Sequence, residues 1–302
     1  MPASQWGWLL ILSVLWGGSF FFVGVAVHAV PTLTLVFFRV ALAAVVLLLV
    51  IGAMGKSLPR SMAAWMPFAV MALLNNIFPF SLITLGQSEI ASGLASVLNA
   101  TTPLWGVVLA HMLTDDEKMT GTRLGGVLLG LAGVAVLMGP AILEGRSSTV
   151  FGMVCVTAGA ISYGFAGLWG RRLRETPPLV TATCQLLCSS LFLLPLVVAV
   201  DQPWQIAMPG LPVILAMTGL AVLSTALAYI LFFHILSVSG GTNVMLVTLL
   251  IPISSIFLGV LFLNENLRPE HIAGALIIAA ALIVFDGRLV AKLSGLLIRN
   301  PR

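Results

Sequence analysis

The residue with the most distinctive chemistry is Arg39, a lone cation inside the apolar stretch 32–54. If a membrane-crossing helix begins near Thr32, Arg39 lies roughly 10 Å below the membrane surface, at about 1.5 Å per residue. A cation at the centre of such a helix costs about 2.5–3.5 kcal/mol unless it is paired or hydrated. Two roles explain it: a bidentate partner for the carboxylate of a bound solute, or a structural donor to carbonyl oxygens at helix ends.

Other polar and aromatic side chains recur inside apolar stretches, at comparable places in the two halves of the chain. An aromatic, amide-lined cavity suits a flat amphipathic solute, which stacks on rings while amides bind its polar end. The same residue types also bond neighbouring helices or anchor interfaces, so packing is the alternative role for each. The candidate binding residues are Trp16, Phe20, Arg39, Asn76, Phe80, Asn99, Ser162, Tyr163, Tyr229, Asn243 and Thr248.

Three prolines, Pro79, Pro103 and Pro252, fall among these candidates. Proline removes an amide donor and clashes with the preceding turn, so we expect helix breaks or gating points there. Metal and cofactor sites are not expected. Cys184 and Cys188 share a helix face, but no His or carboxylate joins them, and small apolar packing is their simplest role.

The elements that must hold these residues are membrane helices. Hydrophobic residues make up 60% of 302 and charged residues only 8%, against roughly 25% charged in soluble domains. Stretches long enough to cross a ~30 Å hydrocarbon core recur at 7–27, 32–54, 65–86, 90–112, 122–139, 150–170, 179–200, 209–236, 242–263 and 270–290. The sequence therefore predicts an all-α polytopic membrane protein with ten transmembrane helices.

Basic residues give the expected orientation, because Lys and Arg concentrate in cytoplasmic loops. One side of the expected membrane carries only Arg146 and Arg268. The other side carries Lys56, Arg60, Lys118, Arg123, Arg171, Arg172, Arg174, Arg288, Lys292, Arg299 and Arg302. Both termini are therefore expected in the cytoplasm. The net charge of +4 is a topology signal, and no nucleic-acid partner is expected.

The two halves repeat each other. Aligning Pro103 with Pro252 places Asp116 on Glu265 and Gly125 on Gly274 without a gap. Five crossings per copy is an odd number, so the second copy inserts upside down, an arrangement typical of transporters with a site at mid-membrane. We expect a first repeat at 1–148 and a second, inverted one at 149–302. Glycines of 122–139 and Gly274 are expected to pack helices closely, within the molecule or between copies.

These patterns resemble the drug/metabolite transporter superfamily, specifically its ten-helix EamA-type exporters. The resemblance rests on Leu15-Trp16-Gly17-Gly18-Ser19, on Phe38-Arg39, and on the Pro103…Asp116…Gly125 and Pro252…Glu265…Gly274 patterns. It departs from the family at Asp115-Asp116-Glu117, where a single Glu is usual. Among members the chain looks most like bacterial aromatic amino acid exporters. The resemblance implies inner-membrane export of such amino acids by alternating access at a cavity between the repeats, with the lipid bilayer and a small solute as partners.

Energy coupling follows from where acids are missing. No Asp or Glu falls well inside an expected span, whereas ion-driven pumps usually bury a carboxylate. His111 and His234 are the titratable groups nearest the spans, and interfacial hydrogen bonding is the more common role of such residues. The pattern favours facilitated, downhill export. The oligomeric state is open.

Two alternatives remain. Within the superfamily, other amino acids, amines or lipophilic drugs are possible cargoes. Outside it, a membrane-embedded transferase would need an acidic cluster for Mg²⁺ or a nucleophile with a base. Asp115-Asp116-Glu117 is the only acidic cluster, and its repeat-mate keeps one Glu between two Asn. An enzyme is therefore not expected.

Overall fold

A computed structural model describes residues 3–115, 119–239 and 247–286. Within these ranges the regular elements are all helical, as the composition predicts, and the prediction of a polytopic all-α fold is confirmed. The α-helices are α1 (Ala3–Ala26), α2 (Thr32–Ala53), α3 (Met66–Ala72), α4 (Phe78–Gln87), α5 (Ser92–Asn99), α6 (Thr102–Leu113), α7 (Gly121–Leu143), α8 (Ser147–Trp169), α9 (Pro178–Leu196), α10 (Leu211–Ala221), α11 (Ala228–Ser239), α13 (Val247–Leu263) and α14 (Pro269–Asp286).

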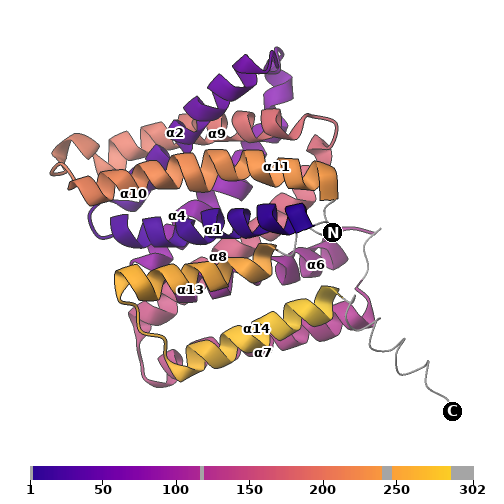
Figure 1. The fold of residues 1–302 in the computed structure, drawn as a ribbon, viewed down its shortest axis with the longest axis vertical. Helices are drawn as coiled ribbons and strands as arrows, with labels where there is room; N and C mark the ends of the chain where they lie inside the picture. The colour runs from indigo at the N-terminus through magenta and orange to yellow at the C-terminus, as the bar shows by residue number, and fades with distance from the viewer. Residues whose placement is uncertain (1–2, 116–118, 240–246, 287–302) are drawn as a thin grey trace.

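Several helices combine into longer membrane spans. Eight described spans are long and apolar enough to cross a membrane, among them Met62–Gln87, Ser92–Leu113 and Leu211–Val238. The two remaining apolar helices, Val247–Leu263 and Pro269–Phe285, are shorter. Together they match the ten crossings expected from the sequence. The described starts of α1 and α14 lie at opposite ends of the bundle, and α14 finishes at the end where α1 begins (Figure 1).

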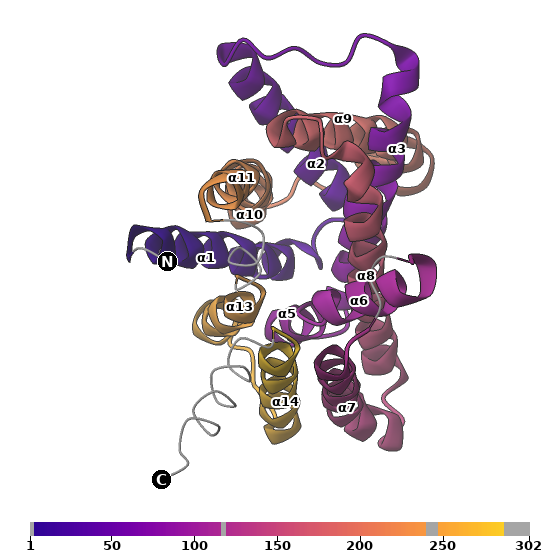
Figure 2. The same ribbon diagram turned by 90° about the vertical axis from the view of Figure 1, so that its right-hand side faces the viewer.

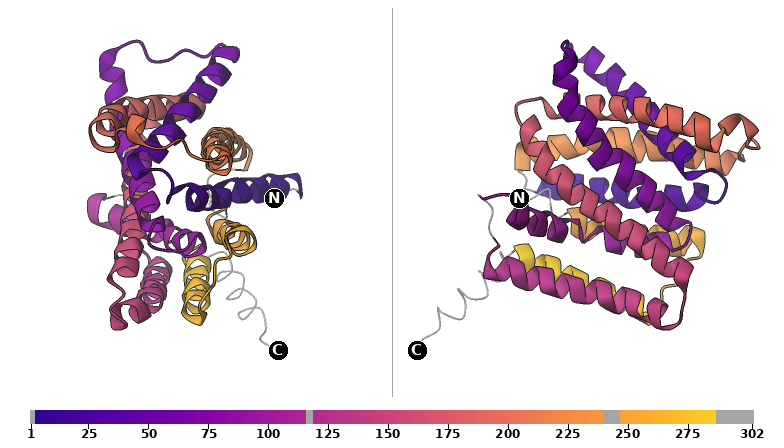
Figure 3. Two further views of the ribbon diagram at one scale, coloured as in Figure 1. Left: turned by 90° about the vertical axis from the view of Figure 1, so that its left-hand side faces the viewer. Right: turned by 180° about the vertical axis from the view of Figure 1, so that it is seen from behind.

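The helices pack as an inverted pair of five-helix units. Helix α1 packs on α13 of the other half, and α8 packs in the same way on α6 and α5. Helix α4 packs on α8, and its counterpart α11 packs on α1, as does α10. Helices α2 and α9 pair with each other, as do α7 and α14. Seen end-on, α11, α1, α13 and α14 form one layer (Figure 2), and from behind α4 and α8 run side by side in the other (Figure 3).

Glycine seams allow the closest of these contacts. A Cβ added at Gly133 would lie 2.7 Å from Ile278 Cγ1 and 3.2 Å from the Gly274 carbonyl oxygen, and one at Gly274 would lie 3.1 Å from the Gly133 carbonyl oxygen. Gly126 meets α14 similarly at Ala281 and Phe285, whereas Gly130 lies closest to Leu104 of α6. Packing by small residues within the molecule, one of the two expected roles, is confirmed for these positions.

A substitution of Gly133 by Leu should destabilise the protein by about 1–3 kcal/mol, the usual cost of overpacking a close contact. Gly125→Leu on the same helix is the matched control, because a Cβ there meets nothing within 4 Å. Thermal unfolding of the two variants in one detergent measures the difference. Equal melting temperatures for both variants would contradict the seam.

Two π-turns, in which the helix widens, interrupt the apolar spans Met62–Gln87 and Leu211–Val238 at equivalent places in the two halves. A π-turn, η2 (Leu73–Ile77), separates α3 from α4, and a second, η6 (Val222–Leu227), separates α10 from α11. Adding 149, the offset between Pro103 and Pro252, carries Leu73 to Val222. Such turns occur frequently at functional sites because they leave carbonyl groups without helical partners. In the second half the Thr225 hydroxyl donates to the carbonyl oxygen of Leu220 at 2.8 Å.

Candidate functional site

Arg39 lies in the centre of the bundle with partners from four other helical segments. Its Nε–H donates to Thr225 Oγ1 of η6 at 3.0 Å. Its guanidinium carbon lies 3.5 Å from the centroid of the Phe80 ring of α4, within range of a cation–π interaction. The Phe80 ring meets the Tyr163 ring of α8 edge-on at 6.5 Å. Arg39, Phe80, Tyr163, Thr225 and Tyr229 are called the Arg39 cluster below.

The cluster contains a buried cation without an acidic partner. Arg39 is only 9% exposed. Among the described residues no ion pair reaches Arg39. The titratable groups with which Arg39 interacts electrostatically are Tyr163 and Tyr229. Two tyrosines and a ring face supply no full negative charge, so the cluster retains the electrostatic capacity to hold an anion.

A polar network centred on Tyr229 extends the cluster to α9. The Tyr229 hydroxyl accepts from Asn75 Nδ2 at 3.1 Å and from Gln185 Nε2 at 3.4 Å, and donates to Asn76 Oδ1 at 3.4 Å. The Asn76 side chain is fully buried and donates through Nδ2 to Ser189 Oγ at 2.9 Å. The two π-turns thus face α9 and α2 in mirrored fashion, through Asn76 in one half and Thr225 in the other.

An aromatic chain connects this network to α1. The Tyr229 ring stacks on Phe233 at 6.0 Å, and Phe233 meets Phe232 at 5.2 Å. The Phe232 ring lies 5.3 Å from that of Trp16, which is partly buried. In this conformation the Phe80 ring covers the Arg39 guanidinium, and the chain of rings runs from Tyr229 to α1.

The remaining predicted residues lie farther from Arg39 or serve local bonds. Ser162 donates to the Leu74 carbonyl oxygen at 2.8 Å, inside π-turn η2. Phe20 packs in the core, and its carbonyl oxygen accepts from Gln87. Asn99 ends α5, with a buried Oδ1 that has no hydrogen-bond partner within the described chain. Thr248 borders an apolar cleft away from the cluster, and Asn243 lies outside the described residues.

The three prolines behave differently. Pro103 follows an interruption between α5 and α6, and Pro79 opens α4 directly after π-turn η2. At Pro252 the expected break is not seen, because α13 continues through it. Pro252 occupies the second turn of that helix, where its missing amide deprives only the Thr248 carbonyl of a helical donor.

Two carboxylates clamp the halves together at one end of the bundle. Glu265, which follows α13, accepts from the backbone N–H groups of Ser92 (2.7 Å) and Gly93 (3.1 Å) at the start of α5. Asp201, the last residue of the π-turn η4 (Val197–Asp201) that follows α9, accepts from the N–H (2.6 Å) and hydroxyl (2.8 Å) of Thr34 in the first turn of α2. A carboxylate at a helix N-terminus accepts hydrogen bonds from backbone N–H groups that have no acceptor within the helix. Its negative charge is also stabilised by the positive end of the helix dipole. We call this end the Glu265 end.

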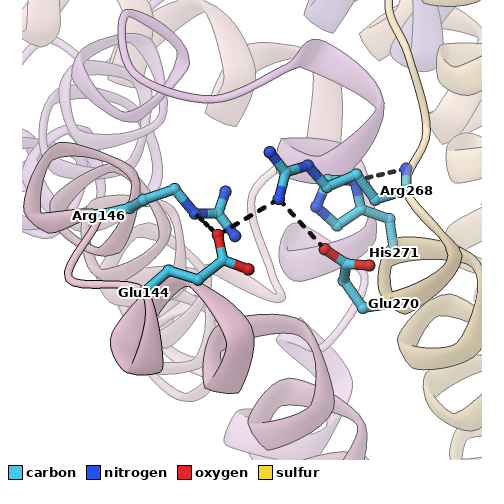
Figure 4. Close-up of polar contacts among 5 residues, drawn as sticks. All are labelled: Glu144, Arg146, Arg268, Glu270 and His271. Carbon is cyan, nitrogen blue, oxygen red and sulfur yellow. Dashed lines mark hydrogen bonds and ion pairs between the residues drawn. The ribbon is translucent and has the colours of Figure 1, made fainter.

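An ion-pair network lies at the same end. Glu144 Oε2 is 2.7 Å from Arg146 Nε and 3.5 Å from Arg268 Nη1, and Arg268 also lies 3.6 Å from Glu270 Oε1 (Figure 4). The network connects the segment after α7 to the beginning of α14. Its side chains are partly exposed, so its contribution to stability is small.

Comparison with known proteins assigns the fold to a family. The model of the EamA-like transporter family matches residues 5–139 and again 150–285. The chain belongs to the EamA-like transporter family. Its resemblance to EamA-type transporters is thereby confirmed, and it is a transporter and not an enzyme. A solved crystal structure that is 18% identical shares the fold with a TM-score of 0.67, covering 97% of this chain and all of that one.

Relatives in this EamA-like family are similar over most of their length. The uncharacterized transporter YoaV of Bacillus subtilis is 23% identical, over 91% of this chain and 94% of the relative. The uncharacterized inner membrane transporter YedA of Escherichia coli is 24% identical, over 93% and 90%. Protein PecM of Dickeya dadantii is 25% identical, over 89% and 88%. These names support a multi-pass membrane transporter of small molecules.

Proposed function

We propose that this EamA-like protein exports small amphipathic metabolites, with aromatic amino acids as the preferred cargo. The observation that carries the proposal is the Arg39 cluster: a buried cation without a carboxylate partner, enclosed by aromatic rings where the two halves meet. The carboxylate of a bound solute would neutralise the charge of Arg39. The aromatic ring of the same solute would take the place of a protein ring in the contacts around Arg39. A fixed buried cation disfavours cationic amines, which leaves amino acids ahead of them among the family's cargo classes.

Transport would proceed by alternating access between repeats 1–148 and 149–302, in a bacterial inner membrane with both termini cytoplasmic. The distribution of Lys and Arg then makes the Glu265 end the non-cytoplasmic one. The described spans bury no carboxylate to carry a coupling ion. His111 accepts from the Met119 N–H, and His234 packs edge-on against Trp8, both on exposed positions. These positions support facilitated export.

Counterflow in proteoliposomes tests this function. Purified protein should exchange labelled phenylalanine or tryptophan without an imposed proton gradient, and a cationic amine of similar size should move more slowly. Strict dependence on the gradient would contradict facilitation. An absence of flux for every aromatic amino acid, with protein correctly inserted, would contradict the cargo.

The ring chain gives a further prediction. Trp16→Ala and Tyr229→Ala should each slow exchange about three- to tenfold, because an aromatic contact contributes roughly 0.5–1.5 kcal/mol beyond its buried area. Trp204→Ala is the matched control, since Trp204 is 64% exposed near the end of the bundle. Initial rates of exchange, normalised to inserted protein, provide the comparison. Wild-type rates in both ring variants would remove these rings from the solute path.

A further inference from the structure

An apolar cleft runs along the side of the bundle, away from the Arg39 cluster. It has a volume of about 380 Å³ and is bordered by α5, α13 and α14. Among the side chains that border it, only Thr248 and His271 carry polar atoms. Neither carries a full charge deep in the cleft, because Thr248 has a neutral hydroxyl and His271 lies in the first turn of α14, at the entrance. The cleft is therefore chemically unlike the transport site.

The cleft exists because two consecutive helices pack on different neighbours. Helix α13 packs on α1 and α5, whereas α14 packs on α7 (Figure 2). Small residues line the space between them, among them Gly93, Ala100, Ala275 and Ala279. Larger residues at these positions would fill it. The divergence of the helices and the small side chains together produce a groove that the side chains of the described residues leave unfilled.

The groove opens towards the surrounding membrane. Ile253 of α13 and Leu276 of α14 border it and are 65% and 66% exposed. On the side of a membrane-spanning bundle, such surfaces meet lipid tails, and an empty apolar space forfeits dispersion contacts.

The dimensions and the entrance of the groove match one lipid tail. From His271 to Leu282 it extends along α14 for about 16 Å, at about 1.5 Å per residue. That is half of a ~30 Å hydrocarbon core, the depth of a single leaflet. At its entrance lie His271 and, on the preceding turn, Arg268, whose guanidinium is half exposed (Figure 4). Arg268 Nη1 lies 3.5 Å from Glu144 Oε2 and 3.6 Å from Glu270 Oε1, which leaves its other guanidinium N–H groups, with the His271 ring, as donors to a lipid phosphate.

We propose that this groove binds one acyl chain of a phospholipid from the leaflet at the Glu265 end, with the phosphate beside Arg268 and His271. The lipid is a structural partner of α5, α13 and α14 and is separate from the exported solute. It fills the space that holds α13 and α14 apart. Failure of this proposal would leave the export function untouched, since the Arg39 cluster lies elsewhere.

Native mass spectrometry of the full chain, extracted in mild detergent and supplied with phosphatidylglycerol, tests the groove. Wild type should retain one phospholipid, and Ala279→Phe, which fills the groove, should retain at least about tenfold less. Leu128→Phe is the matched control, because Leu128 is 59% exposed on α7 and does not border the groove. Equal retention by wild type and Ala279→Phe, or none by wild type, would overturn the proposal.

A second measurement uses only the wild-type protein, so it tests the groove even if Ala279→Phe fails to fold. Wild-type protein is reconstituted with a phospholipid that carries a photoreactive diazirine in its acyl chain, and labelled peptides are mapped. Labelling should concentrate on residues 272–282 and 93–100. Even labelling of all lipid-facing helices contradicts a groove. Displacement of the label by excess phenylalanine also contradicts it, because the groove would then admit cargo.

Discussion

Replacing Arg39 by Met should abolish most transport without lowering the thermal stability of the protein. Removal of one charge-assisted contact, worth about 1.5–3 kcal/mol, lowers the exchange of phenylalanine about 10- to 100-fold if Arg39 holds the cargo carboxylate. Stability should hold or rise, because a buried cation without a carboxylate partner costs about 2.5–3.5 kcal/mol at the centre of a membrane helix. Melting temperature in detergent and exchange rate in proteoliposomes are measured on one preparation.

This pairing separates the two roles of Arg39. If the side chain serves only to bond Thr225 and cover Phe80, Arg39→Met should melt earlier and its properly inserted fraction should exchange at the wild-type rate. Arg39→Lys provides the conservative control: it keeps the charge and loses the planar fork, so part of the activity should remain. Wild-type exchange by Arg39→Met would eliminate the carboxylate role.

Among single alanine substitutions at the Glu265 end, Glu265→Ala should lower the free energy of unfolding the most. It leaves the N–H groups of Ser92 and Gly93 without their charged acceptor, 2.7 and 3.1 Å away in the native protein. Loss of a charge-assisted helix cap lowers the free energy of unfolding by about 2 kcal/mol. The clamp also joins α13 of one half to α5 of the other, so its loss should loosen contact between the halves. Thermal unfolding in detergent measures the effect.

Two further variants interpret that result. Glu265→Gln keeps an oxygen acceptor and loses the charge, so its melting temperature should fall between those of wild type and Glu265→Ala. Glu175→Ala is the matched control, because Glu175 is exposed at the opposite end. If Glu265→Ala and Glu175→Ala melt together, the clamp contributes nothing measurable.

Sequence pattern was enough to predict the helices but not their internal irregularities. Apolar length alone identifies crossings, because backbone groups in hydrocarbon must bond within a helix. It carries no information about where a helical turn widens, so it does not predict the matching π-turns η2 and η6. A signal was present in retrospect: Asn75-Asn76 and Ser224-Thr225 stand at the same register in the two halves. Polar pairs in apolar spans compete for backbone bonds and favour such distortions.

The candidate site was predicted in composition but not in its connections. Arg39, Phe80, Tyr163 and Tyr229 were recognised as unusual for apolar spans, and the structure brings them into one cluster. Their partner Thr225 was not among the predicted binding residues, because a hydroxyl in a membrane helix has many possible acceptors and donors. Which helix faces which is decided by tertiary packing, and a single sequence reports that only weakly.

The acids illustrate the same limit. Alignment of the halves singled out Glu265 by its position after Pro252, yet its role depends on Ser92, which is 173 positions away, and on Gly259, whose missing side chain leaves room for the carboxylate. A Cβ at Gly259 would lie 2.4 Å from Glu265 Oε2, so only glycine leaves room for the carboxylate to reach α5. Asp201 and Thr34, separated by 167 positions, offered no local pattern at all.

The matching π-turns say something about how this molecule arose. A π-turn is an α-helix with one surplus residue, and the same surplus occupies the same register in both halves, although the flanking residues have diverged. Two independent insertions at one register are a far less economical history than one. The irregularity therefore belonged to the single five-helix ancestor, and gene duplication copied it along with the rest.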